Sequence, residues 1–322
     1  MSSTANDVSV IIPAYNCEDV IEETLASVFD QTVAPGEILV MDDGSPDGTA
    51  ERVERFAPRV TLFRQENQGP SRARNELIRR ARGKWIALLD ADDLWHPSYL
   101  ETQLVAVRRY PEAVVVGTAF RDLPEGQGRP PWETLGTAET ELIPSREFLQ
   151  RFNDGSGIIL PSFALVRAEA FRRMGEHPMP LNLRGVEDVY LWYHLGLFGP
   201  FARTPVRAGY YRLLWRSLSN DRLRAFRDRV AAMEQVVELY RREADASWVR
   251  FATRHLTCAH RQAAKYFLGV GDQVSARHQL QRALRTSFDL KSLGLFGLSF
   301  LPRTWQPAWP ARYRFQMLND AV

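Results

Sequence analysis

The chain has 322 residues, which is long enough for one large or two ordinary domains with a sizeable core. Its 41 basic and 39 acidic residues leave a formal net charge of +2, so there is no electrostatic argument for a nucleic-acid partner. The sequence has no signal-peptide pattern and no apolar run near the roughly 18–20 residues of a membrane span. Its two cysteines match no zinc or disulfide spacing. Together these features predict a cytoplasmic protein.

The first third of the sequence alternates short apolar runs with amphipathic helical patterns. The apolar runs are typical of buried strands in a parallel sheet. They cover residues 8–12, 38–41, 60–63, 85–89 and 114–118. The helical patterns cover residues 18–31, 47–56, 71–82 and 97–110. This alternation predicts an α/β fold, in which a mostly parallel sheet with right-handed crossovers is flanked by helices.

The middle of the sequence is less regular, and the last third is helical. Residues 121–140 and 175–185 are rich in proline, glycine and charge and are expected to be loops. Further strands are predicted at 162–166 and 207–214, and helices at 145–152, 167–174 and 186–198. From residue 220 onward three helical patterns follow, at 221–244, 248–268 and 273–287. We therefore expect an α/β domain over residues 1–219 and a helical C-terminal region over 220–322, which ends in an aromatic and basic tail.

Three predicted strands end in small polar or acidic residues, in segments 8–16, 37–45 and 85–93. Ligands of open α/β sheets bind in the crevice at the carboxyl ends of the strands. The carboxylates at these ends are Asp42, Asp43, Asp90, Asp92 and Asp93. The sequence therefore predicts a site for a metal ion and a polyhydroxylated, phosphorylated ligand.

The acidic segment 90–93 is the most informative of the three. Asp90 and Asp92 share one face of a strand, while Asp93 faces the other way. Such a pair can hold a ribose diol or a hard cation, since Mg²⁺ or Mn²⁺ commonly bridges one or two carboxylates and substrate phosphates. The alternative is a solvated acidic turn that caps the following helix, a role that would suit Asp93.

The segment 42–49 offers Asp42 or Asp43 as an acceptor for a base N–H or a ribose hydroxyl, followed by turn residues. The spacing nearly fits a calcium-binding loop. Calcium is rejected because a strand, rather than a helix, precedes the segment and Pro46 interrupts it.

Two further segments have both a functional and a structural interpretation. At the start of the predicted helix 71–82, Arg72 and Arg74 would either meet a phosphate or form surface ion pairs. Glu187 and Asp188 begin another helix, where the helix dipole favours acidic residues. One of them would serve as a general base if that helix faces the same crevice.

The ordered set of these motifs resembles family 2 glycosyltransferases, which have the GT-A fold and mostly invert the anomeric configuration. The motifs are PAYN (13–16), DDGSPDGT (42–49), NQGPSRARN (67–75), LLDADD (88–93), the Glu187–Asp188 pair and YRLLWRSLS (211–219). The resemblance covers roughly residues 8–219. It implies a nucleotide-sugar donor, usually UDP-linked, and a divalent metal, Mn²⁺ or Mg²⁺.

The resemblance also implies roles for individual residues on the donor side. Pro13, Ala14 and Tyr15 match the loop that contacts the nucleoside, and Tyr15 can stack on the base. Asp43, or its neighbour Asp42, matches the acid that binds the base. Asp90 matches the sugar-side acid of the DxD motif, and Asp92 its metal ligand; Arg74 is the candidate for phosphate contact.

On the acceptor side, Asp188 matches the catalytic base, and Glu187 is the less favoured choice. Trp192 matches an aromatic residue that often follows this pair and stacks on the acceptor sugar. One departure is Leu214, which stands where the family often has a histidine that completes the metal or diphosphate shell. Arg212 or Arg216 would then neutralise the diphosphate instead.

The sequence thus predicts an inverting glycosyltransferase acting on a glycan or lipid-linked acceptor in cell-envelope or exopolysaccharide synthesis. A catalytically inactive nucleotide-sugar-binding or scaffold protein, and a nucleotidyltransferase, are the alternatives. The absence of a GxGxxG after the first strand argues against a dinucleotide oxidoreductase. The tail 290–315 would either contact the inner face of a membrane or pack on the protein, since its prolines prevent one continuous amphipathic helix.

Overall fold

The computed structural model of the chain describes residues 5–136, 138–183, 185–214 and 221–301. After the short 3-10 helix η1 (Ala5–Asp7), strands and helices alternate. They are β1 (Val8–Ala14), α1 (Ile21–Phe29), β2 (Glu37–Asp42), α2 (Thr49–Glu54), β3 (Thr61–Arg64), α3 (Pro70–Arg80) and β4 (Trp85–Leu88). Each of these strands and main helices overlaps a predicted one, so the α/β interpretation is confirmed.

The next part of the chain departs more from the sequence-based expectation. Its elements are β5 (Leu94–Trp95), α4 (Tyr99–Arg109), β6 (Val115–Pro124), β7 (Glu141–Ile143), α5 (Ser145–Asp154), η2 (Pro161–Phe163), β8 (Ala164–Arg167), α6 (Ala168–Met174), α7 (Glu187–Leu195) and β9 (Phe201–Leu213). β5 and β7 were not predicted, and β6 runs into the predicted loop 121–140. All three pair with the long strand β9, so partners distant in sequence stabilise them.

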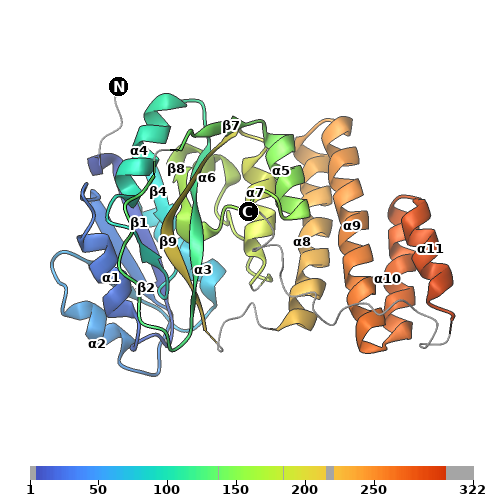
Figure 1. Cartoon of the computed structure of the whole chain (residues 1–322), viewed down its shortest axis with the longest axis horizontal. Coiled ribbons are helices and arrows are strands. Elements are labelled where there is room, and N and C mark those ends of the chain that lie inside the picture. The colour runs from blue at the N-terminus through green and yellow to red at the C-terminus, as the bar shows by residue number, and fades with distance from the viewer. Residues whose placement is uncertain (1–4, 137, 184, 215–220, 302–322) are drawn as a thin grey trace.

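Among the described residues the strands form one nine-stranded sheet with the order β3-β2-β1-β4-β8-β6-β9-β5, and β7 pairs with β9. β3, β2, β1 and β4 are parallel, whereas β8 runs antiparallel to both β4 and β6. Figure 1 shows α1 and α2 beside the N-terminal strands, and α8 to α11 extending away on the other side. The sheet is therefore mixed, with its parallel half formed by the strands that carry the predicted site.

Two clusters of buried side chains cover the two faces of the sheet. On β1, Val10 and Ile12 lie in the cluster that contains Leu25 of α1, while Ile11 lies in the cluster that contains Leu77 of α3. This alternation is the period of two expected of a strand that is buried on both faces. Both faces are covered by helices, so ligands can approach the parallel strands at their ends.

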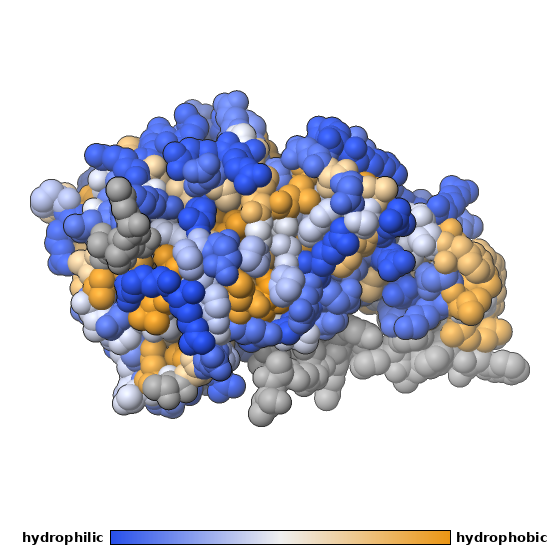
Figure 2. Space-filling model, turned by 90° about the horizontal axis from the view of Figure 1, so that it is seen from above, coloured by the Kyte–Doolittle hydropathy of each residue, from blue (hydrophilic) through white to orange (hydrophobic). Residues whose placement is uncertain are grey.

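The C-terminal region consists of α8 (Arg222–Glu243), α9 (Ala246–Val270), α10 (Gln273–Thr286) and α11 (Leu290–Leu298). Each begins after an aspartate whose carboxylate accepts backbone N–H groups of the first turn, a favourable N-cap. These aspartates are Asp221, Asp245, Asp272 and Asp289. Hydrophobic residues gather at the end of the molecule formed by α10 and α11 (Figure 2).

Helices α8 and α9 contribute to the same buried cluster as α7 and one face of the sheet. The predicted boundary after residue 219 falls in segment 215–220, outside the described residues, and remains a prediction. Residues 302–315 of the predicted tail also lie outside them. Within the described ranges, every helix is too short or too polar to serve as a membrane span.

Candidate functional site

The loops that follow β1, β2 and β4 meet at one edge of the sheet. Ala14 at the end of β1 pairs with Asp42 at the end of β2, and the Asp43 N–H donates to the Ala14 carbonyl at 2.8 Å. On the other side of β1, Ile11 pairs with Leu88 of β4, two residues before Asp90. Parallel register thus brings the predicted nucleoside loop and both acidic segments to one edge.

Asp42 and Asp43 are buried and hold the neighbouring loops. The Asp43 carboxylate accepts the Gln65 side-chain amide at 2.6 Å and the backbone N–H groups of Gln68 at 3.0 Å and Gly69 at 2.7 Å. Gly69 has φ +89°, a conformation that favours glycine, and it positions its N–H at the start of α3. Much of the hydrogen-bonding capacity of Asp43 is therefore used within the protein, and base binding by either acid remains a prediction.

The residues after β1 differ in their access to solvent. Ala14 is buried, Pro13 is partly exposed, and the Tyr15 side chain is 51% exposed. Asp42 beside them has one carboxylate oxygen, Oδ1, that accepts the Ser45 N–H at 3.1 Å, and the other lies 3.4 Å from Arg64 Nε. An exposed aromatic ring at this edge is suitable for stacking on a planar base.

Arg74 joins the acidic segment to helix α7. Its Nη2 lies 2.5 Å from Asp90 Oδ1, and its Nη1 lies 2.5 Å from Glu187 Oε1. The side chains of Arg74 and Glu187 are 7% and 8% exposed, whereas that of Asp90 is 29% exposed. For Arg74 the surface ion pair is wrong, because its two ion pairs are formed by a buried guanidinium, while phosphate contact remains a prediction. The guanidinium is a buried bridge that fixes the start of α7 relative to the end of β4.

The two acids at the start of α7 have different surroundings. Glu187 binds Arg74 with one oxygen, and its other oxygen accepts the Gly185 N–H at 2.7 Å. In the described part of the chain, the one hydrogen bond of the Asp188 carboxylate comes from the Val189 N–H, at 2.9 Å. The helix that begins with these acids therefore faces the same edge as Asp90, and Asp188 retains the greater capacity to accept a proton.

Burial and the negative charge of Glu187 raise the pKa of Asp188 to about 7. The positive charges of Arg229 and Arg74 act in the opposite direction. Arg229 lies on α8, is buried, and donates to the Asn153 side-chain oxygen at 3.3 Å. Sequence patterns offered no signal for Arg229, because it is one of many arginines in the C-terminal helices and only the packing of α8 on α7 brings it close.

The segment Asp92–Asp93 is tied to the end of β9. Arg212 donates through Nε to the Asp92 carbonyl at 2.8 Å, through Nη2 to Glu23 at 2.7 Å, and through its backbone N–H to Asp93 Oδ1 at 2.9 Å. Its side chain is 11% exposed, and Leu214 is buried close by in sequence. Arg212 thus holds the acidic loop in place. Contact between Arg212 and a diphosphate remains a prediction. The alternative candidate, Arg216, lies outside the described residues.

Asp93 is fully buried, so its interpretation as a solvated helix cap is wrong. Burial, together with the negative charges of Asp92 and Asp90, raises its pKa. The described residues contain no group of three or more His, Cys, Asp or Glu side chains that could hold a metal ion by themselves. The metal prediction therefore depends on Asp92 and Asp90 acting together with substrate phosphates.

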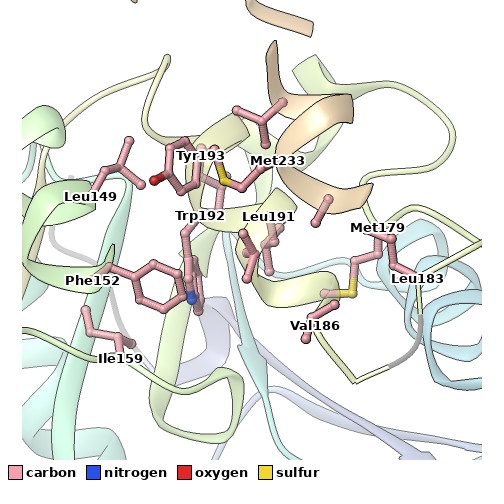
Figure 3. Close-up of a cluster of buried hydrophobic side chains, with 14 of the residues drawn as sticks. Leu149, Phe152, Ile159, Met179, Leu183, Val186, Leu191, Trp192, Tyr193 and Met233 are labelled. Carbon is pink, nitrogen blue, oxygen red and sulfur yellow. The ribbon is translucent and has the colours of Figure 1, made fainter. Parts of the chain in front are cut away.

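Trp192 is not positioned to meet an acceptor. Its side chain is 0% exposed and packs edge-on against Phe201, with ring centroids 6.4 Å apart. Figure 3 shows it inside the cluster that also contains Phe152 and Leu191. This placement contradicts the predicted stacking role, because α7 turns Trp192 toward α5 and β9 rather than toward the crevice.

Contacts from the C-terminal helices hold α7 in place. The Tyr240 hydroxyl donates to the Tyr193 carbonyl at 2.7 Å, and the Tyr193 hydroxyl hydrogen-bonds His255 Nδ1. The other ring nitrogen of His255 bonds Gln150 of α5 at 2.9 Å. The helix that carries Asp188 is therefore supported from α5, α8 and α9.

A separate cavity of about 360 Å³ lies beside Trp132 and Tyr210 and is lined by His96, Arg121 and Arg207 among others. None of the predicted site residues lines it. The Trp132 ring is already covered by the Tyr210 ring, at a centroid distance of 4.8 Å, and by the Arg129 guanidinium, whose central carbon lies 4.9 Å from the Trp132 centroid. It is not an open platform for a sugar ring.

Comparison with known proteins adds to this geometry. The model of the family described as "Glycosyl transferase family 2" matches residues 9–175. WfgD of Escherichia coli, a UDP-Glc:alpha-D-GlcNAc-diphosphoundecaprenol beta-1,3-glucosyltransferase, is 42% identical over 99 residues, which are 30% of this chain and 39% of WfgD. The uncharacterized glycosyltransferase YibD of Escherichia coli (strain K12) is 41% identical over 105 residues, 32% of this chain and 30% of YibD. The matches thus span well under half the length of these relatives.

Solved structures share the fold over most of the chain. S. aureus TarS 1–349 in complex with UDP-GlcNAc has a TM-score of 0.68 at 16% identity, covering 91% of this chain and 90% of that chain. The mannosyltransferase PcManGT from Pyrobaculum calidifontis, in complex with GDP-Man and Mn²⁺, has a TM-score of 0.57 at 21% identity, covering 94% and 84%. At these identities the likeness concerns the fold alone. Since the family model matches just over half of the sequence, including the strand ends described above, the chain belongs to glycosyltransferase family 2.

Proposed function

We propose that this protein is an inverting glycosyltransferase that moves a sugar from a nucleotide-sugar donor, a UDP-sugar in the first instance, to a hydroxyl of a glycan or lipid-linked acceptor. The observation that carries the proposal is the Arg74 bridge between Asp90 and Glu187. It connects the donor-side acid of the family motif to the helix that bears Asp188. The name of WfgD, with a UDP-linked donor and a diphosphoundecaprenol acceptor, supports this substrate class. We propose a role in cell-envelope or exopolysaccharide synthesis on the same ground.

On the donor side, Tyr15 stacks on the base, Pro13 and Ala14 line its pocket, and Asp43 or Asp42 accepts its N–H. Asp90 binds the sugar, and Arg74 holds Asp90 in position. Asp92, with Asp90 beside it, would hold Mn²⁺ or Mg²⁺, for which partly exposed carboxylates are suitable ligands. Such a cation supplies positive charge that stabilises the departing diphosphate.

On the acceptor side, Asp188 removes the proton from the attacking hydroxyl. The hydroxyl oxygen bonds to the anomeric carbon from the face opposite the diphosphate, which leaves with the electrons of the broken bond. The proton ends on the Asp188 carboxylate, and the anomeric configuration inverts. Glu187 keeps its charge paired with Arg74 and orients the start of α7.

Calorimetric titration with UDP, GDP and dTDP, with and without Mn²⁺, tests the donor site. We expect UDP to bind most tightly, and only with the metal, because the diphosphate needs a counter-charge in this acidic loop. Asp92→Asn is expected to abolish this metal-dependent UDP binding, while Asp30→Asn, which removes an exposed acid after α1, leaves it unchanged. Equally tight binding without metal would contradict the metal assignment, and no binding of any nucleotide would favour the scaffold alternative.

The rate of transfer is expected to rise with pH through about 7, because the raised pKa leaves Asp188 protonated in acid, where it cannot accept a proton. Arg229→Gln removes a positive charge that lowers this pKa, so the midpoint of the profile should move to higher pH. Arg224→Gln is the matched control and should not move it, because the partly exposed Arg224 lies on the same helix but pairs with Asp228, at 3.5 Å. Profiles of kcat/KM against pH for the wild type and the two variants measure these midpoints. A flat wild-type profile between about pH 5.5 and 8.5 would contradict the assignment of Asp188 as the base.

A further inference from the structure

Helix α11 presents an uncharged face to solvent. Leu290 and Leu293 are 77% and 43% exposed, and Phe300, just after the helix, is 60% exposed. Gly294 and Gly297 lie between them, and a side chain added at either would meet nothing within 4 Å. The helical spacing places the four α11 residues on one side of the helix. Phe300 follows the helix, and its ring packs edge-on against Phe296 with ring centroids 5.2 Å apart. We call these five residues the α11 face.

The opposite side of α11 is the one that packs on the protein. Ser292, Leu295 and Ser299 are buried there, and Leu295 lies in a cluster with Leu280 of α10. The Asp289 cap fixes the first turn. The exposure of the α11 face therefore reflects a definite orientation of the helix, and the face lies at the end of the molecule farthest from the parallel strands (Figure 1).

The sequence that follows the Asp289 cap carries charge of a single sign up to residue 319. Between Asp289 and Asp320 the sequence contains no acidic residue, and its basic residues are Lys291, Arg303, Arg312 and Arg314. The same stretch contains Trp305 and Trp309, and tryptophan is enriched at membrane–water interfaces. Apolar side chains accompanied by basic residues are the composition that binds anionic lipid surfaces.

We propose that the α11 face docks on an anionic membrane surface, with Leu290, Leu293 and Phe300 entering the boundary between headgroups and acyl chains. A second copy of the chain fits less well, because two such faces packed together would bring the Lys291 side chains of the two copies close to each other. The chain's own tail shares the positive sign of Lys291 and fits less well for the same reason. Docking would bring the protein to a surface that carries lipid-linked acceptors, so in this respect the inference extends the proposed function.

Flotation of the full-length protein with vesicles tests the proposal. We expect binding to vesicles that contain phosphatidylglycerol, weaker binding to pure phosphatidylcholine, and loss of binding at high salt, since exposed charges are screened. The triple variant L290S/L293S/F300S should bind about ten-fold more weakly, because it removes the apolar contacts. Val105→Ser, which changes a 51% exposed valine on α4, is the matched control and should bind like wild type.

Other readouts separate docking from folding and from catalysis. The triple variant should retain the wild-type melting temperature and the wild-type rate on a water-soluble acceptor. Absence of flotation, or flotation that the triple variant retains, would overturn the proposal. A dimer that the triple variant dissociates, seen by light scattering without vesicle binding, would also overturn it and assign the face to a second copy. Vesicle binding by a protein that transfers no sugar would leave docking intact and reject the proposed function instead.

Discussion

Replacing Asp188 with asparagine is expected to lower the rate of sugar transfer by about 10²–10⁴-fold, the usual contribution of a general base. Asparagine has nearly the same size but cannot take up the acceptor proton. The donor site uses other residues, so the affinity for UDP should remain within about two-fold of wild type. Single-turnover assays and calorimetric titration on the same preparation measure the two quantities.

Glu176→Gln is the control for this experiment, since it neutralises an exposed carboxylate that precedes α7 and should leave transfer unchanged. Normal transfer by Asp188→Asn would show that another group accepts the proton. Loss of UDP binding together with loss of transfer would point to a structural role for Asp188 rather than a catalytic one.

Replacing Arg74 with methionine is expected to reduce the free energy of unfolding by about 3–5 kcal/mol, as removal of one partner from a buried ion pair usually does. The change leaves Glu187 buried without its cation, and most of the effect should come from that acid because Asp90 is partly exposed. Urea unfolding monitored by circular dichroism measures it. Arg74→Lys should reduce the free energy of unfolding by an intermediate amount, since a single ammonium group cannot reproduce the contacts of the guanidinium with both carboxylates.

Two further variants make the Arg74 result interpretable. Arg72→Met, two residues away on α3, removes a less buried arginine and should cost less than about 1 kcal/mol. The double variant Arg74→Met/Glu187→Gln should recover part of the lost stability, because the buried charge is removed together with its partner. An effect of Arg74→Met as small as that of Arg72→Met would contradict the importance of the bridge.

The parts of the fold that could be predicted from the sequence are those governed by local patterns. The strands β1 to β4 are continuous apolar runs bounded by turn residues, and the helices between them are amphipathic. β5 and β7 were missed because they have two and three residues and exist through pairing with β9. α11 was missed because Gly294 and Gly297 weaken its helical pattern, while the Asp289 cap and the packing of Leu295 stabilise it.

The residues of the candidate site were likewise predictable where local sequence patterns position them. Asp42 and Asp90 follow apolar runs, and parallel strands bring their ends to one edge whatever the rest of the chain does. Trp192 was misassigned, because the sequence of α7 is apolar on several sides and does not tell which side meets α5. Asp93 was misassigned because its burial depends on β9, more than a hundred residues later.

The sequence by itself determined the family and the strand ends at which its acids lie, since both follow from ordered motifs and local hydrophobic patterns. The family resemblance already favoured Asp188 over Glu187, but only the tertiary structure showed how the surroundings of the two acids differ. Adjacent residues on a helix point about 100° apart, so the packing of α3 and α8 against α7 decides which carboxylate meets a buried guanidinium. Glu187 faces Arg74 and is neutralised by it, whereas Asp188 has no such partner among the described residues and, being desolvated, acquires a pKa near the pH at which a base is useful.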